Sequence, residues 1–186
     1  MPRNAVTPAQ MLRGGQVLCG KNATRRHLNL AMKQAAGFPS AYPTGGSEKI
    51  ICLKNRNDLG LVNGMFLTLE DPKDEDEISF SAVAMSADGD RIGGGTAQKP
   101  DRLRFYKGHF DDHVTPDKDR EQRDYFAKKT LIETTWGWAI TCHKSQGSQW
   151  ENVVVYDDGL GRTTDDRARW LYTAITRAEK GFVILA

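Results

Sequence analysis

The stretch TCHKSQGSQW, residues 141–150, decides how the rest of the chain is interpreted. It follows one apolar run, WAITC (138–142), and precedes another, NVVVY (152–156). Such runs are typical of buried strands, so the stretch predicts a loop between the end of one strand and the start of the next. Farther along, a helical pattern from about residue 166 to residue 178 and the run FVILA predict a helix and a last strand.

Residues near the start of the chain supply a matching strand and helix. QVLCG (16–20) predicts a short buried strand, after which the side chain of Asn22 is placed to cap a helix. Apolar residues recur along that helix at helical spacing, namely Leu28, Ala31, Met32 and Ala35. Together with the later strands, these segments predict one mostly parallel α/β sheet.

Residues from about 46 to 129 follow a different pattern. EKIICLKN, LGLVNGMFLTLE and the alternating apolar residues before Asp88-Gly89 predict short antiparallel strands. In residues 101–129 basic and acidic side chains are mixed, which favours a long exposed excursion over core. We therefore expect an α/β domain formed by residues 1–45 and 130–186, with a small β module, residues 46–129, inserted into it.

Length, cysteine content and charge narrow the class of protein. The 186 residues suit one core, or one core with a small insertion, and no apolar run approaches the roughly 18 residues of a membrane span. The three cysteines lie far apart, and no signal-peptide core follows the first arginine. We expect a cytoplasmic protein without membrane contact, disulfides or a metal site. Residues 1–47 hold six basic side chains and no acidic one, which suits a polyanionic partner.

One segment raises the alternative of a complete small ATPase. GQVLCGKN (15–22) nearly fits the phosphate loop G-x-x-x-x-G-K-[ST], and VVVYDD (153–158) resembles a strand that ends in a magnesium-binding acid. However, Asn22 lacks the hydroxyl that ligates magnesium, and the residues between the two glycines have the composition of a strand rather than of a loop of backbone amides. We favour a strand that runs into a capped helix.

Three segments resemble motifs of the RecD/Dda-like superfamily 1B helicases, whose C-terminal domain is UvrD-like. TCHKSQGSQW resembles their motif V, T-x-H-K-[ST]-Q-G-[ST]-[EQ]-[WF]. WLYTAITRA (170–178) resembles motif VI, and NATRRHLN (22–29) resembles the motif IV region, N-x-T-R-x-x-[IL]-N. The likeness covers nearly the whole chain, from residue 17 to residue 186.

The resemblance implies both a fold and a function. The fold is a second RecA-like domain of the P-loop NTPase type, a parallel sheet flanked by helices, with an inserted SH3-like β-barrel module. The function is that of the C-terminal motor segment of an ATP-dependent DNA helicase moving 5′ to 3′. ATP and Mg²⁺ serve the full-length enzyme, while the isolated segment is expected to be inactive and to bind no cofactor tightly. The alternative is a non-catalytic nucleic-acid-binding or regulatory module of the same fold.

The resemblance also implies partners and individual roles. Expected partners are single-stranded DNA, the N-terminal RecA-like domain of the same protein, and other replication or recombination subunits. Arg177 is implied to be the catalytic arginine finger that reaches the γ-phosphate. The other expected ATP contacts are Arg25, Gln146, Gly147 and Gln149. The expected DNA contacts are Asn22, Thr141, His143, Lys144, Ser145 and Thr173. On the motif VI helix, spacing predicts a buried face of Leu171, Ala174, Ile175 and Ala178.

Overall fold

The computed structural model describes residues 1–96 and 101–186, and the chain divides into two compact units. Unit 1 comprises residues 1–37 and 138–186, and unit 2 comprises residues 38–137. The expected β module, residues 46–129, falls within unit 2, to which the flanking residues 38–45 and 130–137 also belong.

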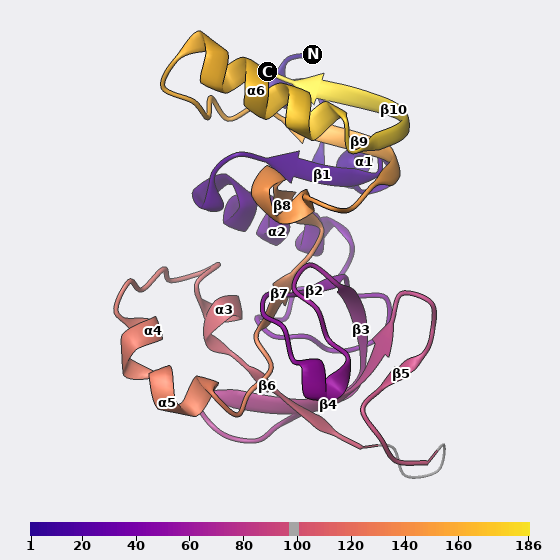
Figure 1. Cartoon of the computed structure of the whole chain (residues 1–186), viewed down its shortest axis with the longest axis vertical. Helices are drawn as coiled ribbons and strands as arrows, with labels where there is room; N and C mark the ends of the chain where they lie inside the picture. Colours follow the sequence, from indigo (N-terminus) through magenta and orange to yellow (C-terminus); the bar gives the residue numbers. More distant parts are fainter. Residues whose placement is uncertain (97–100) are drawn as a thin grey trace. The chain divides into compact units, whose positions relative to one another are not determined.

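Unit 1 is built on a parallel sheet with the strand order β10-β9-β1-β8 (Figure 1). The strands are β1 (Gln16–Cys19), β8 (Ala139–Thr141), β9 (Trp150–Tyr156) and β10 (Ala178–Leu185). Each neighbouring pair runs parallel, which confirms the mostly parallel sheet predicted from the sequence. Every residue of β1 is buried, as expected for an inner strand that is covered on both faces.

Helices surround this sheet. They are η1 (Arg3–Ala5), α1 (Pro8–Arg13), α2 (Asn22–Ala35), η3 (Cys142–Ser145) and α6 (Thr164–Ile175). Figure 1 shows α6 lying along β9 and β10, while α2 packs on α1 and on the edge strand β8. Helices α1 and α6 both begin with a capping box, formed by Thr7 with Gln10 and by Thr163 with Asp166.

One buried amide joins α2 to the edge of the sheet. Asn29 is fully buried; its Nδ2 donates to the Ala139 carbonyl oxygen, and the Ala139 N–H donates to its Oδ1, both at 2.8 Å. The side chain thereby occupies the place that a further strand would take beside β8. The predicted apolar face is confirmed at Leu28 and Met32 but is wrong at Ala35, which is exposed, because Asn29 takes part of the buried face.

The start of α2 differs from the prediction. Lys21 rather than Asn22 is the N-cap residue, and no side chain caps the helix. Instead, the Lys21 N–H donates to Oδ2 of Asp158 at 2.7 Å, and Lys21 Nζ donates to the Asp158 carbonyl oxygen at 2.7 Å. A Cβ added to Gly20 would lie only 2.5 Å from Leu160. Residues 15–22 therefore form a strand and a closed turn, which confirms the preference for a strand over a phosphate loop.

The last helix ends earlier than predicted. Helix α6 stops at Ile175, and Ala178 already begins β10. The buried residues of α6 are Trp170 and Ala174, which lie four residues apart on one face, whereas Leu171 and Ile175 are only half-buried. The predicted apolar face is thus confirmed at Ala174, is only half-buried at Leu171 and Ile175, and omits Trp170, the other buried residue of the helix.

Unit 2 is built on an antiparallel sheet. Its strand order is β5-β4-β3-β2-β7, and β6 also pairs with β4 (Figure 1). The strands are β2 (Ile50–Cys52), β3 (Phe66–Asp74), β4 (Ser79–Ser86), β5 (Arg91–Ile92), β6 (Leu103–Tyr106) and β7 (Thr134–Trp136). Short helices occur in the connections, namely η2 (Asn57–Leu59), α3 (Gly108–Asp111), α4 (Arg120–Arg123) and α5 (Tyr125–Lys128). The antiparallel pairing agrees with the sequence pattern.

The charge-rich segment 101–129 contributes to the core of unit 2. Phe105 and Phe110 are buried; Phe105 stacks on Phe80 with ring centroids 5.3 Å apart, and Phe110 packs edge-on against Trp136 at 4.9 Å. The expectation of an exposed excursion is therefore wrong for residues 103–110. Apolar side chains turn inward there, while Arg102 and Arg104 form ion pairs with Asp71 and Asp76 outside the segment.

Two negative findings apply to residues 1–96 and 101–186. No helix there is long and apolar enough to cross a membrane. Within the same residues, no group of three or more His, Cys, Asp or Glu side chains is arranged to hold a metal ion. His109 instead pairs with the Glu133 carboxylate at 2.8 Å, and Nδ1 of His113 lies 3.0 Å from the His109 carbonyl oxygen.

Candidate helicase motifs and their pocket

Motif V forms a tight turn after β8. Thr141 is buried at the strand end, and Ser145 is buried in the following η3, where its Oγ donates to the Cys142 carbonyl oxygen at 2.7 Å. The Ser145 side chain, which the resemblance assigned to DNA, therefore holds the turn together. Gly147 follows with φ of 86° and open space where a Cβ would lie, a left-handed conformation that favours glycine.

Motif VI closes α6. Thr173 Oγ1 donates to the Arg169 carbonyl oxygen at 2.8 Å. A threonine inside a helix commonly makes this bond to the carbonyl group four residues before it. Arg177 is half-buried and lies beyond the helix, in the turn before β10. Its Nε donates to the Thr173 carbonyl oxygen at 3.2 Å, and a terminal nitrogen donates to Thr176 Oγ1 at 3.4 Å. These contacts hold the guanidinium against the last turn of α6.

Motif V contacts motif VI through a backbone hydrogen bond and through a buried thiol. The Trp150 N–H donates to the Arg177 carbonyl oxygen at 2.9 Å, and the Cys142 thiol lies 3.9 Å from the Trp170 carbonyl oxygen. Burial raises the pKa of the Cys142 thiol, although the hydrogen bond to Ser145 and the charge of Arg177 oppose it. The thiol is therefore neutral at pH 7, and it serves as a packing group between the two motifs.

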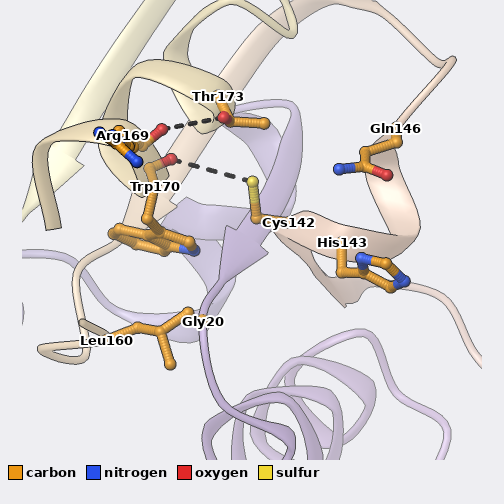
Figure 2. Close-up of a pocket in the computed structure, with 8 residues that line it drawn as sticks. All are labelled: Gly20, Cys142, His143, Gln146, Leu160, Arg169, Trp170 and Thr173. Atoms are coloured by element: carbon orange, nitrogen blue, oxygen red, sulfur yellow. Dashed lines mark hydrogen bonds between the residues drawn. The ribbon is translucent and has the colours of Figure 1, made fainter. Parts of the chain in front are cut away.

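A pocket of about 250 Å³ opens between the two motifs and the end of β1. Its lining comprises Gly20, Cys142, His143, Gln146, Leu160, Arg169, Trp170 and Thr173. Figure 2 shows the motif V residues on one side of this pocket and the α6 residues on the other. Two side chains expected to contact DNA, His143 and Thr173, thus share one pocket with Gln146, which was expected to contact ATP.

Arg169 and Trp170 line the pocket but were not singled out from the sequence. Trp170 is 9% exposed, and within the described residues its indole Nε1 is buried without a hydrogen-bond partner. Arg169 is exposed and brings a positive charge to the pocket rim. The sequence does contain a signal for Trp170. This residue is the first of the motif VI segment, and its position four residues before Ala174 places it on the same helix face.

The remaining predicted residues lie outside the lining that the structure describes for the pocket. Asn22 is exposed in the first turn of α2. Arg25 is half-buried and lies close enough to Cys19 for its positive charge to oppose the rise that burial causes in the pKa of that thiol. Gly147 and Gln149 are exposed beyond η3, whereas Lys144 is half-buried within it. The structure therefore gathers only part of the expected site.

The acids at the end of β9 are engaged within unit 1. Asp157 is buried and pairs with Arg167, and its Oδ1 accepts the Gly159 N–H at 3.0 Å. Burial alone would raise the pKa of Asp157, but Arg167 and the Gly159 amide outweigh it and hold the pKa below its usual value. Asp158 binds Lys21, as described above. These carboxylates thus fasten α6 and the turn after β1.

Comparison with known proteins adds a family and a fold. Residues 137–185, which contain motifs V and VI, match the UvrD-like helicase C-terminal domain family. No curated protein sequence matches the chain. Among solved structures, Bacteroides Pif1 bound to ssDNA is similar, with a TM-score of 0.50, 14% identity and coverage of 92% of this chain and 40% of that one. A structure of two coordinating Pif1 helicases on forked dsDNA has a TM-score of 0.50, 15% identity and coverage of 92% and 39%.

At these identities the likeness establishes the fold alone. The chain spans about two fifths of the length of the Pif1 structures. Residues 137–185 are thus similar to the C-terminal domain of UvrD-like helicases, and the chain shares its fold with part of the Pif1 helicases.

Proposed function

We propose that this chain is the C-terminal motor segment of an ATP-dependent DNA helicase, in which it holds single-stranded DNA and supplies an arginine to an ATP site. In this proposal unit 1 is the second RecA-like domain, and unit 2 is an SH3-like insert. The family match and the parallel sheet of unit 1 support it. The similar Bacteroides structure, which is bound to ssDNA, supports the choice of ligand.

The full-length protein would need further parts for this activity. An N-terminal RecA-like domain would provide the phosphate-binding loop and, with Mg²⁺, hold ATP against Arg177. Movement from 5′ to 3′ and a place in replication or recombination belong to the same proposal. Within the described residues, Nη1 of Arg177 makes no hydrogen bond, which suits a donor to the γ-phosphate.

The observation that carries the proposal is the direct link between the two motifs. The pocket is bordered by His143 of motif V and Thr173 of motif VI, and the Trp150 N–H binds the carbonyl oxygen of Arg177. DNA that shifts the motif V turn would therefore shift the backbone that carries Arg177. Such a link is a physical route by which strand binding could stimulate ATP hydrolysis.

Titration of a labelled single-stranded oligonucleotide tests the DNA-holding role. With two or three phosphate contacts at about 0.7 each, the log-log salt slope should lie near −1.4 to −2. His143→Ala should weaken binding about three- to tenfold, a loss of roughly 0.7–1.4 kcal/mol as expected for one exposed hydrogen bond. His27→Ala is the matched control, because His27 is also exposed but lies on α2 away from the pocket. Absence of binding at low salt, or equal effects of the two variants, would contradict the proposal.

A further inference from the structure

Helix α5 of unit 2 presents two adjacent aromatic rings to solvent. Tyr125 is 56% exposed and Phe126 is 79% exposed. Their ring centroids lie 5.4 Å apart and their planes are 79° from each other, so the rings pack edge to face. A single exposed aromatic residue needs no explanation, whereas these two form a small continuous apolar surface.

A lysine sets positive charge against both rings. Lys129 Nζ lies 4.7 Å from the centroid of the Tyr125 ring and 5.2 Å from that of the Phe126 ring. Attraction between the ammonium and the ring faces favours this arrangement. Aromatic ring surface and a positive charge therefore lie within the span of one nucleotide, which carries a flat base and an anionic phosphate.

The other side of α5 is tied to the body of unit 2. Asp124, directly before the helix, accepts a hydrogen bond from the Tyr106 hydroxyl at 2.5 Å. Lys128 pairs with Glu133 at 3.0 Å, and its ammonium lies 5.4 Å from the centroid of the Tyr106 ring. Since Tyr106 and Glu133 are both buried, these contacts fix the helix. The exposed rings are thereby held outward before any ligand binds, which reduces the entropic cost of binding.

We propose that Tyr125, Phe126 and Lys129 form a stacking platform for the bases of single-stranded DNA. This second contact, on unit 2, rests on the DNA-holding function proposed above and is separate from the motif V turn. Sites for single strands combine aromatic rings with positive charge, whereas lysine is depleted from the cores of protein interfaces. Arg123, three residues from Phe126, is paired with the Asp117 carboxylate at 2.8 Å, so Lys129 supplies the positive charge of the platform.

The test compares the binding of two oligonucleotides of equal length and charge, one normal and one with abasic sites. Stacking is lost without bases, whereas phosphate contacts remain, so the wild-type chain should prefer the normal strand. The double variant Tyr125→Ala with Phe126→Ala should bind the normal strand at least about fivefold more weakly, the lower limit for one stacked base. It should also lose the preference over the abasic strand.

Two single variants separate the rings from the charge. Tyr125→Phe keeps the ring and should bind normally, within about twofold. Lys129→Gln should retain the preference for bases but reduce the salt slope by about 0.7, the value for one phosphate contact on a single strand. Circular dichroism melts of all variants should match the wild type, because the substituted side chains are exposed.

Each outcome distinguishes the platform from the motif V site. If His143→Ala weakens binding while the double ring variant does not, the platform is refuted and the proposed function stands. If the ring variant alone weakens binding and abolishes base preference, the platform holds and the motif V assignment fails. If DNA affinity is unchanged but sedimentation shows an altered oligomeric state, the rings form a protein contact and the stacking proposal is overturned.

Discussion

The substitution Asn29→Ala tests how α2 is fastened to the sheet of unit 1. In the wild type, the Asn29 side chain satisfies both the N–H and the carbonyl group of Ala139 at 2.8 Å. Ala139 is fully buried, so alanine at position 29 would leave both of these backbone groups without a partner. The change removes no charge and leaves the helix propensity favourable.

The expected loss of stability follows from this geometry. Each buried group left without a hydrogen bond costs about 1–3 kcal/mol, so the two together should lower the free energy of unfolding by roughly 2–6 kcal/mol. That is a large fraction of the roughly 5–15 kcal/mol typical of a domain. The matched control is Gln34→Ala on the same helix, which should change stability by less than about 0.5 kcal/mol because Gln34 is exposed.

Two measurements check this expectation. Urea denaturation gives the change in unfolding free energy, and amide hydrogen exchange reports directly on the Ala139 N–H. In Asn29→Ala this amide should lose protection more strongly than the inner β1 amides, which keep their partners within the sheet. The reasoning is refuted if Asn29→Ala is as stable as the Gln34→Ala control, or if the Ala139 amide keeps its wild-type protection.

Two further predictions concern charge. In the full-length protein, Arg177→Ala should lower kcat for DNA-stimulated ATP hydrolysis by about three to five orders of magnitude, with little rescue by Arg177→Lys and little change in DNA affinity; steady-state rates within about tenfold of wild type would exclude a catalytic role. In unit 2, burial raises the pKa of Glu133, but His109 and Lys128 outweigh it and hold the pKa at about 2, below the reference value of 4.5. The resulting stabilisation is present above about pH 4.5 and is lost as the pH falls toward 2, so Glu133→Gln should flatten this part of a Tm-against-pH profile, and an unchanged decline would contradict the assignment.

The parallel sheet could be predicted because its strands are local and strongly apolar. QVLC, AIT and VVVY are short runs flanked by turn residues, and a buried parallel strand requires little else. The sequence predicts that these strands share one sheet, but it does not predict their order within the sheet. Pairing joins residues that are far apart in the sequence, such as Val17 and Ala139. The structure of residues 101–129 differs from the prediction because a count of charges does not show which residues face inward, and Phe105 and Phe110 face inward.

The polar contacts that fasten unit 1 could not be predicted from local pattern. Asn29 belongs to the motif IV resemblance, but its partner is Ala139, on a strand that follows the whole of unit 2 in the sequence. Likewise, Lys21 and Asp158 meet only because β1 and β9 are neighbours in the sheet. A helix cap at Asn22 was a reasonable local expectation, yet the long-range carboxylate supplies the bond instead.

Motif V illustrates how one short segment divides structural from exposed residues. In a 3-10 turn, side chains three residues apart lie on the same side. Cys142 and Ser145 share the buried side of the turn, where Ser145 bonds to the Cys142 carbonyl oxygen. His143 and Gln146 share the exposed side and border the pocket. The period of three, rather than the helical period of 3.6, therefore places Cys142 and Ser145 on the buried side of η3 and His143 on its exposed side, so that a buried serine lies between residues proposed to contact DNA and ATP.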